Sequence, residues 1–147
     1  MNVTLVVPTL NEERYLPTAL GDLEAAIQAC SEHVFEVLVV DSDSEDATRR
    51  IAREHPIVDE VRTAGPGILT ARHEGYVRAS GDVVVSLDAD TRYPPSFLEA
   101  LLDPFVVEED VVMSYGPAFG EKTFHLDAWI RLALQYGLRP FGVHWVS

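Results

Sequence analysis

The sequence is poor in several residue types, and each shortage excludes a class of protein. Its single cysteine, Cys30, excludes an intramolecular disulfide and is compatible with a reducing compartment. No apolar run approaches the roughly 20 residues that a membrane-spanning helix needs. The chain opens directly on a strand-like run without a basic segment before it, so we expect no signal peptide. These features favour a cytoplasmic protein, either free or at the inner face of the membrane.

Positive charge is also scarce. Lys122 is the single lysine among 11 basic residues, against 24 acidic residues, and the formal net charge is −13. Such a charge argues against a nucleic-acid partner and against electrostatic binding to an anionic membrane. An acidic, lysine-poor surface is also what we expect of a halophilic protein, because salt screens its self-repulsion. A protein this acidic needs a cation in its site if its substrate is an anion.

What the chain does contain is a regular alternation of strand-like and helix-like segments. Its 147 residues, 47% of them hydrophobic, fit one domain with a real core. The alternation predicts an α/β fold, a three-layer α/β/α arrangement around a mostly parallel sheet. We expect strands at 2–7, 35–40, 58–62, 83–87 and 111–114, and helices at 17–30, 47–54, 68–79 and from 94–95 to about 102.

The chain is organised around residues 83–90, a short apolar run that ends in Asp88 and Asp90. In open α/β sheets ligands bind outside the carboxyl ends of the strands. Side chains two residues apart on an extended strand point to the same side. Two carboxylates on one side suit Mg²⁺ or Mn²⁺, ions that also take substrate phosphates as ligands. The alternative is that Asp90 caps the next helix and Asp88 is solvated.

Two other predicted strands end in polar clusters, at 8–12 and at 41–48. Ser, Thr, Asp and Asn commonly cap helices, and for Ser44 and Asp46 a cap is as good an explanation as a functional role. The joint occurrence of three polar clusters after three strands favours a common site at one edge of the sheet.

The pattern changes from Glu121 onward. Apolar residues at helical spacing predict a further helix ending near Gly137, and several aromatic residues lie in and after this segment. We favour packing of this helix on its own sheet. The alternative is a peripheral contact of 121–147 with a membrane, a partner protein or an acceptor.

Four of these stretches together resemble family 2 glycosyltransferases with the GT-A fold. They are Val6–Glu13, the segment Val39–Thr48 with its Asp followed by Ser-x-Asp-x-Thr, the stretch from Gly65 to Asp82, and the Asp88-Ala89-Asp90 triplet. The resemblance covers residues 3 to about 100. It implies a single GT-A-like domain over 1–147, with a Rossmann-like donor-binding part at 1–115. Residues 116–147 would then begin the acceptor part. Three alternatives stay open: the sequence is a truncated piece of the family domain, it completes its acceptor site with a partner, or it has lost turnover.

The resemblance implies transfer of a sugar from a UDP- or GDP-sugar donor to a glycan, lipid or polyprenyl-phosphate acceptor. By position, donor-binding residues would be Pro8, Thr9, Asn11, Glu12, Asp41 (facing the base), Asp43, Arg72 (on the nucleotide or its phosphates) and Asp88. Asp88 would face the ribose or a metal-bound water, and Asp90, with Asp88, would hold Mn²⁺ or Mg²⁺. For Arg72 the alternative is a surface ion pair with Glu74 or Asp43. His73 is assigned no role.

The implied reaction inverts the anomeric centre and uses a metal ion to stabilise the departing diphosphate. No catalytic base is identified. Glu121 and Asp127 are the only carboxylates beyond Asp110, and neither lies in a family-like context. Two other functions therefore stay open: a non-catalytic nucleotide-sugar-binding module and a nucleotidyltransferase. The acidic loop at Asn11–Glu13 argues against the latter, since a triphosphate needs a glycine-rich, basic loop.

Overall fold

A four-stranded parallel sheet forms the centre of the molecule. The computed structural model describes residues 1–107, 111, 113 and 114. The strands are β1 (Asn2–Thr9), β2 (Val34–Asp41), β3 (Glu60–Thr63) and β4 (Val83–Ser86), in the order β3-β2-β1-β4. All three pairings are parallel, with Asn2 opposite Val34 and Val6 opposite Ser86. Every strand therefore ends at the same edge of the sheet.

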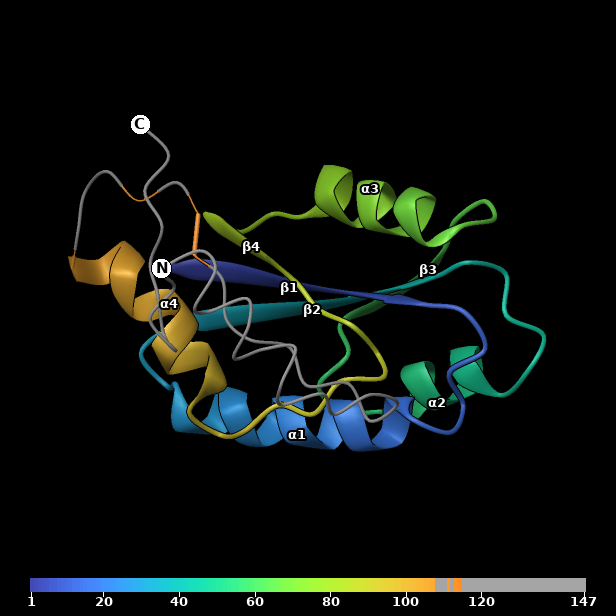
Figure 1. Cartoon of the computed structure of the whole chain (residues 1–147), viewed down its shortest axis with the longest axis horizontal. Helices are drawn as coiled ribbons and strands as arrows, with labels where there is room; N and C mark the ends of the chain where they lie inside the picture. Colours follow the sequence, from blue (N-terminus) through green and yellow to red (C-terminus); the bar gives the residue numbers. More distant parts are fainter. Residues whose placement is uncertain (108–110, 112, 115–147) are drawn as a thin grey trace, which may run out of the picture.

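Helices cover both faces of this sheet (Figure 1). α3 (Ile68–Arg78) lies alone on one face, against β1 and β2. The opposite face carries α1 (Leu16–Ala29), α2 (Thr48–Glu54) and α4 (Phe97–Val107). The predicted three-layer α/β/α arrangement with a parallel sheet is confirmed for the described part of the chain.

Alternation along β1 produces the two faces of the core. Val3, Leu5 and Val7 belong to the large core cluster, which they share with α1 and with Leu98 and Leu102 of α4. Val6 points to the other face and packs with Val40 and with Ala71 of α3. Because β1 is covered on both sides, its residues from Val3 to Thr9 are all buried, as expected of a central parallel strand.

Two predicted segments differ from the structure. The last predicted helix was expected to end near Leu102, but α4 continues through the buried Pro104 to Val107. Proline removes one backbone donor but has helix-compatible φ, so the helix can pass through it at a cost. Val111, Met113 and Ser114 lie in no strand, contrary to the expectation for 111–114. The helix expected between 121 and 138 lies outside the described residues.

Within the same described ranges, the helices are all too short or too polar to cross a bilayer.

Candidate functional site

The three polar clusters meet at the carboxyl edge of the sheet. Thr9 at the end of β1 lies opposite Asp41 at the end of β2. On the other side of β1, Ser86 is opposite Val6, and the Leu87 amide donates to the Val6 carbonyl at 2.9 Å. The loops that follow β1, β2 and β4 thus emerge side by side, as the sequence predicted.

Asp41 is a buried anchor at this edge. Its side chain is fully buried and accepts hydrogen bonds from the Ser44 amide at 2.8 Å, the Ser44 hydroxyl at 2.5 Å and the Thr9 hydroxyl at 3.1 Å. Arg49 Nε lies 3.6 Å from the same carboxylate. Its oxygens are thus engaged inside the protein, and a direct contact with a base would require these bonds to rearrange.

The loop after β1 is joined to the loop after β2 by reciprocal hydrogen bonds. The Asn11 amide donates to Ser44 Oγ, and the Asn11 side-chain oxygen accepts from the Glu45 amide, both at 2.9 Å. The Glu12 amide donates to the Thr48 hydroxyl at 2.8 Å. Asn11 and Asp43 both have positive φ, 54° and 64°, a conformation that Asn and Asp tolerate better than most residues. The two loops therefore form one preorganised wall.

Asp46 and Ser44, for which capping and function were equally open, have different roles. Asp46 is not the N-cap of α2, which is Ala47; it accepts from the Thr48 amide at 2.9 Å and from the Glu13 amide at 3.1 Å, and so joins the start of α2 to the loop after β1. Ser44 caps no helix and bridges Asp41 to Asn11. Arg49 was not predicted as a site residue; it donates to the Ser44 carbonyl at 2.9 Å and lies 3.9 Å from Asp43. Its position in the first turn of α2 is the signal that could have revealed it.

Arg72 of α3 pairs with Asp88. Its Nη2 atom contacts Asp88 Oδ1, and its Nη1 atom donates to Ser86 Oγ at 2.6 Å. Arg72 therefore reaches the metal motif itself, whereas the alternative partners suggested by sequence were Glu74 and Asp43. Both side chains are only partly buried, 27% and 47% exposed, so this ion pair is accessible to a ligand. The pair places one guanidinium and one carboxylate beside the loop that follows β1.

Asp90 does not continue the extended geometry of β4. The strand ends at Ser86, and the Thr91 amide donates to the Asp88 carbonyl at 3.3 Å, closing a turn over residues 88–91. The expectation that Asp88 and Asp90 share one side of an extended strand is therefore wrong, because the strand ends before Asp88 and Asp90 lies within a turn. Asp90 is half-buried at the same edge of the sheet.

The residues that hold this turn were not predicted from the sequence. The Tyr93 hydroxyl donates to the Asp88 carbonyl and accepts from the Asp88 amide, both at 2.8 Å. Burial raises the pKa of Tyr93 well above its usual range, so the hydroxyl keeps its proton. Asp22 of α1 accepts two bonds from Arg92, at 2.6 and 3.1 Å, and one from the Tyr93 amide at 3.1 Å. The hydrogen bond from Arg92 lowers the pKa of Asp22, and no local sequence signal indicated this long-range brace.

The donor set fits a hard divalent cation. Two carboxylates, Asp88 and Asp90, stand in one braced turn, and oxygen ligands of this kind suit Mg²⁺ and Mn²⁺. The cation that now balances Asp88 is Arg72, which is also suited to pair with a diphosphate. The site as described thus offers a place for a metal and one for an anion. The carboxylates Glu121 and Asp127 lie outside the described residues.

Sequence relatives of this chain are glycosyltransferases that bear polyprenyl-phosphate names. Over 117 residues it is 32% identical to a dolichol-phosphate mannosyltransferase of Pyrococcus furiosus, covering 77% of this chain and 32% of that protein. Over 116 residues it is 34% identical to an undecaprenyl-phosphate 4-deoxy-4-formamido-L-arabinose transferase of Pseudomonas fluorescens, covering 75% and 34% respectively. The chain thus spans about a third of the length of these relatives.

Solved structures with the same fold include glycosyltransferases bound to nucleotides. Glucosyl-3-phosphoglycerate synthase of Mycobacterium tuberculosis, crystallised with Mn²⁺, UDP and its product, superposes with a TM-score of 0.62 at 26% identity, over 75% of this chain and 41% of that one. TarS of S. aureus in complex with UDP-GlcNAc gives a TM-score of 0.57 at 29% identity, over 70% and 31%. These neighbours have the GT-A fold, which confirms the predicted fold.

The profile of the family described as Glycosyl transferase family 2 matches residues 4–140, nearly the whole chain. The resemblance seen in the motifs is confirmed, and the chain belongs to glycosyl transferase family 2.

Proposed function

We propose that this chain forms the donor-binding part of a metal-assisted glycosyltransferase. The donor is a nucleotide-diphosphate sugar, held at the carboxyl edge of the sheet, and the acceptor is a polyprenyl phosphate. Transfer inverts the anomeric centre. The whole chain works as one domain, with the donor site in residues 1–115 and the acceptor side beginning in 116–147.

The observation that carries this proposal is the contact between Arg72 and Asp88. It joins α3 to the turn after β4. This turn lies at the edge of the sheet where β1 and β2 end and their preorganised loops begin. A guanidinium that is held by Ser86 and partly exposed is a strong partner for a diphosphate. In a chain with a net charge of −13, this is the kind of local positive charge that an anionic donor requires.

Donor binding redistributes charge at this contact. The diphosphate takes over hydrogen bonds from Arg72, and Asp88 is released to face the ribose or the metal ion. Asn11 and Glu12 line the nucleotide pocket. Pro8 and Thr9, which are buried at the end of β1, support it from beneath, and Asp41 and Asp43 support it from the neighbouring loop. Because Asp41 is saturated by Ser44 and Thr9, its role is to hold the wall in shape, while backbone groups of the loop meet the base.

Asp90, with Asp88, would hold Mn²⁺ or Mg²⁺. When bound, the ion supplies positive charge that stabilises the diphosphate as it leaves. The Mycobacterium tuberculosis enzyme has been crystallised with Mn²⁺ or Mg²⁺ together with UDP, which supports this choice of ion. Tyr93 and the Asp22–Arg92 pair keep the carboxylate turn in place before the ion arrives.

The acceptor is inferred from the sequence relatives. Dolichol phosphate and undecaprenyl phosphate appear in the names of the relatives at 32–34% identity. The phosphoglycerate acceptor in the name of the Mycobacterium tuberculosis enzyme belongs to a protein at 26% identity. We therefore favour a polyprenyl phosphate over a soluble acceptor, and a site at the inner face of the membrane. A peripheral contact through 121–147 would fit that site.

A non-catalytic nucleotide-sugar-binding module is the second candidate. It is favoured by one observation: the described residues include no carboxylate assigned as the base that would deprotonate an acceptor. Hydrolysis of the donor, measured with and without polyprenyl phosphate, separates the two functions. Turnover supports a transferase, and binding without turnover supports the module.

Isothermal titration calorimetry with UDP- and GDP-sugars in the presence of Mn²⁺ tests the donor site. We expect one donor to bind with a metal requirement, and Asp90→Ala to weaken that binding by at least about tenfold, as loss of a metal contact does. Asp103→Ala is the matched control, because Asp103 is an exposed aspartate on α4, away from the carboxyl edge.

Two results would contradict the assignment. One is the absence of nucleotide binding with Mn²⁺ at high salt. The other is an Asp90→Ala protein that binds the donor as tightly as the Asp103→Ala protein does.

A further inference from the structure

A second group of metal-binding side chains lies at the opposite end of the sheet. Cys30, Glu32 and His33 occupy the turn between α1 and β2, at the amino end of β2. β2 runs for eight residues from there to Asp41, so the turn is about 23 Å from the donor site at 3.3 Å per residue. Figure 1 shows the amino ends of β1 and β2 on one side of the molecule and their carboxyl ends on the other. A ligand bound here is distinct from the donor-site cation.

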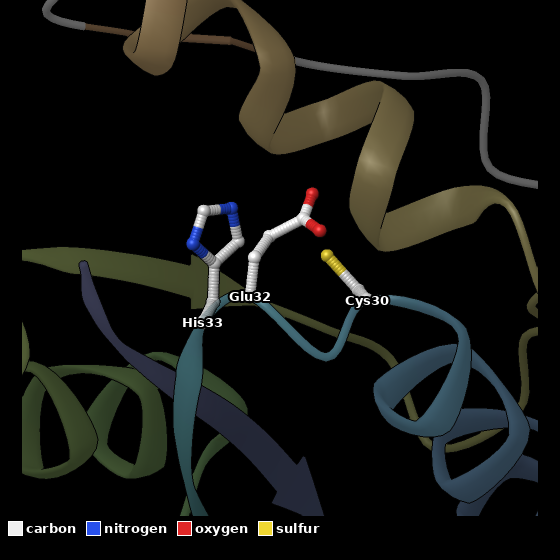
Figure 2. Close-up of side chains that lie close together, drawn as sticks. All are labelled: Cys30, Glu32 and His33. Atoms are coloured by element: carbon white, nitrogen blue, oxygen red, sulfur yellow. The ribbon is translucent and has the colours of Figure 1, made fainter.

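The three side chains converge on one point. Each offers one ligand atom, and these atoms all lie within 4.8 Å of one another. Figure 2 shows the Glu32 carboxylate between the Cys30 sulfur and the His33 ring, beneath α4. The backbone of the turn is held by the Cys30 amide bonding to Ile27 at 3.1 Å and the His33 amide bonding to Cys30 at 3.4 Å. A short, hydrogen-bonded turn thus presents all three ligand atoms.

Each residue is suited to a different part of a metal site. Cys30 is buried in the apolar core with 1% exposure, so its position is fixed by packing. His33 is half-buried: its Nδ1 atom is 3.5 Å from the Met1 nitrogen, and its Nε2 atom points toward Glu32 in Figure 2. Glu32 is exposed and can swing. Metal–ligand bonds of about 2.0–2.3 Å put tetrahedral ligands closer together than 4.8 Å, and a rotation of Glu32 can close that gap.

We propose that Cys30, Glu32 and His33 bind one Zn²⁺ ion, with water as the fourth ligand. A thiolate, an imidazole and a carboxylate together match the ligand preference of Zn²⁺, whereas Mg²⁺ and Mn²⁺ prefer sites made of oxygen. The role is structural: the ion fastens the end of α1 to the start of β2. On binding, Cys30 loses its thiol proton to solvent and the sulfur forms the metal bond.

Cobalt spectroscopy tests this site without interference from the donor site. Because Cys30 is the single cysteine, a thiolate-to-Co²⁺ charge-transfer band can come from no other residue. We expect the metal-stripped full-length chain to develop that band with one equivalent of Co²⁺, Zn²⁺ to abolish it, and Zn²⁺ to raise the midpoint of thermal unfolding. Asp90→Ala should keep the band, since that residue lies at the other end of the sheet.

Matched variants locate the other two ligands. His33 is half-buried and Glu32 is exposed, so the His33→Ala and Glu32→Gln proteins should both fold. Each substitution should nevertheless weaken Zn²⁺ binding by at least about tenfold. His73→Ala and Glu54→Gln change the same residue types at exposed positions and should leave Zn²⁺ affinity unchanged. The proposal is overturned if no charge-transfer band forms. It is also overturned if the band survives both His33→Ala and Glu32→Gln, which would mean that Cys30 binds metal between two molecules.

Discussion

Tyr93 is the residue on which the geometry of the carboxylate turn depends most directly. Its hydroxyl is both donor and acceptor to the backbone of a single residue, Asp88, and its ring packs against Phe97 with centroids 4.9 Å apart. Tyr93→Phe keeps the ring and removes both hydrogen bonds. Since it leaves the Asp88 amide unpaired, we expect a loss of about 1–3 kcal/mol in the free energy of unfolding.

The same variant should weaken metal-dependent donor binding, because Asp88 is no longer held. Denaturant unfolding measures the first effect and calorimetry the second. Tyr76→Phe is the control, since Tyr76 is exposed on α3 and should lose less than about 0.5 kcal/mol. Equal behaviour of the two variants would refute the role given to Tyr93.

Glu36 makes stability depend on pH. It accepts from the Thr4 hydroxyl at 2.6 Å and from the Ser80 amide and hydroxyl at 3.2 and 2.9 Å, tying β2 to the turn before β4. The hydrogen bond from Thr4 is the main cause of the lowered pKa of Glu36. A pKa that is lower in the folded than in the unfolded state gives stability that is present above the unfolded pKa. That stability is lost as the pH falls through the folded pKa.

Glu36→Gln should therefore be less stable than the native chain at neutral pH, and the difference should shrink as the solution is acidified. Unfolding curves measured from neutral to acid pH give this difference directly. Glu54→Gln serves as the comparison, because its pairing with Arg50 is an exposed i,i+4 contact worth about 0.3–0.5 kcal/mol. A Glu36→Gln deficit that stays constant down to the lowest pH would contradict the explanation.

At this scale the residue types were predictable from sequence and their contacts were not. Asp41, Asp88 and Asp90 follow predicted strands directly, and Arg72 was implied by the family resemblance, so all four were found. The partners of these residues were missed, because Arg72 reaches Asp88 across 16 positions and Asp22 reaches Arg92 across 70. Side-chain contacts between distant segments leave no periodic trace in the sequence.

Among the secondary-structure elements, α3 packs against the sheet through a glycine, Gly75. A Cβ atom at Gly75 would lie 2.2 Å from Val6 Cγ1, and Val6 is buried and β-branched, so it cannot move aside easily. Gly75→Ala should push α3 away from β1 and lower the free energy of unfolding by about 1–3 kcal/mol despite the better helix propensity of alanine. Because Arg72 is one turn earlier in α3, donor binding should weaken as well.

Gly21→Ala is the opposite case within α1. Nothing lies within 4 Å of a Cβ at that position, so the substitution should stabilise the protein by about 0.5–1 kcal/mol. Chemical denaturation of the two variants measures both changes in the free energy of unfolding, the decrease expected for Gly75→Ala and the increase expected for Gly21→Ala. If Gly75→Ala stabilised the chain as Gly21→Ala is expected to, the close packing of α3 on β1 would be disproved.

Elements were predictable because their apolar patterns are long and regular, and their ends were not. The third strand, expected at 58–62, is Glu60–Thr63. Asp59 meets β2 just before it: its amide donates to the Val37 carbonyl at 3.0 Å, and its side chain, in place of a backbone carbonyl, accepts from the Val37 amide at 2.7 Å. α4 begins at Phe97 and not at Pro94-Pro95, because the Phe97 amide bonds to the Pro94 carbonyl in a preceding turn. Local hydrogen bonds of this kind decide where an element starts, and periodicity does not register them.

At the scale of the whole molecule, the net charge of −13 opposes folding. The ion pairs recorded among the described residues are mostly exposed or partly exposed, so they offset little of that repulsion. Added salt shortens the Debye length from about 10 Å at 0.1 M to about 3 Å at 1 M, which screens charges that lie far apart on the surface. A halophilic habitat would exploit this property, and the measurable consequence is a stability that increases with salt.

We expect the midpoint of thermal unfolding to rise with KCl concentration, and most of the rise to be complete by about 1 M, where screening saturates. Asp103→Lys tests the cause, because it changes the net charge by two, from −13 to −11, at an exposed position on α4. If self-repulsion limits stability, this variant should be more stable than the native chain at low salt, by up to about 0.5 kcal/mol, and equal to it at high salt. A midpoint that does not respond to KCl, or an advantage of Asp103→Lys that persists at high salt, would show that long-range repulsion is not what salt relieves.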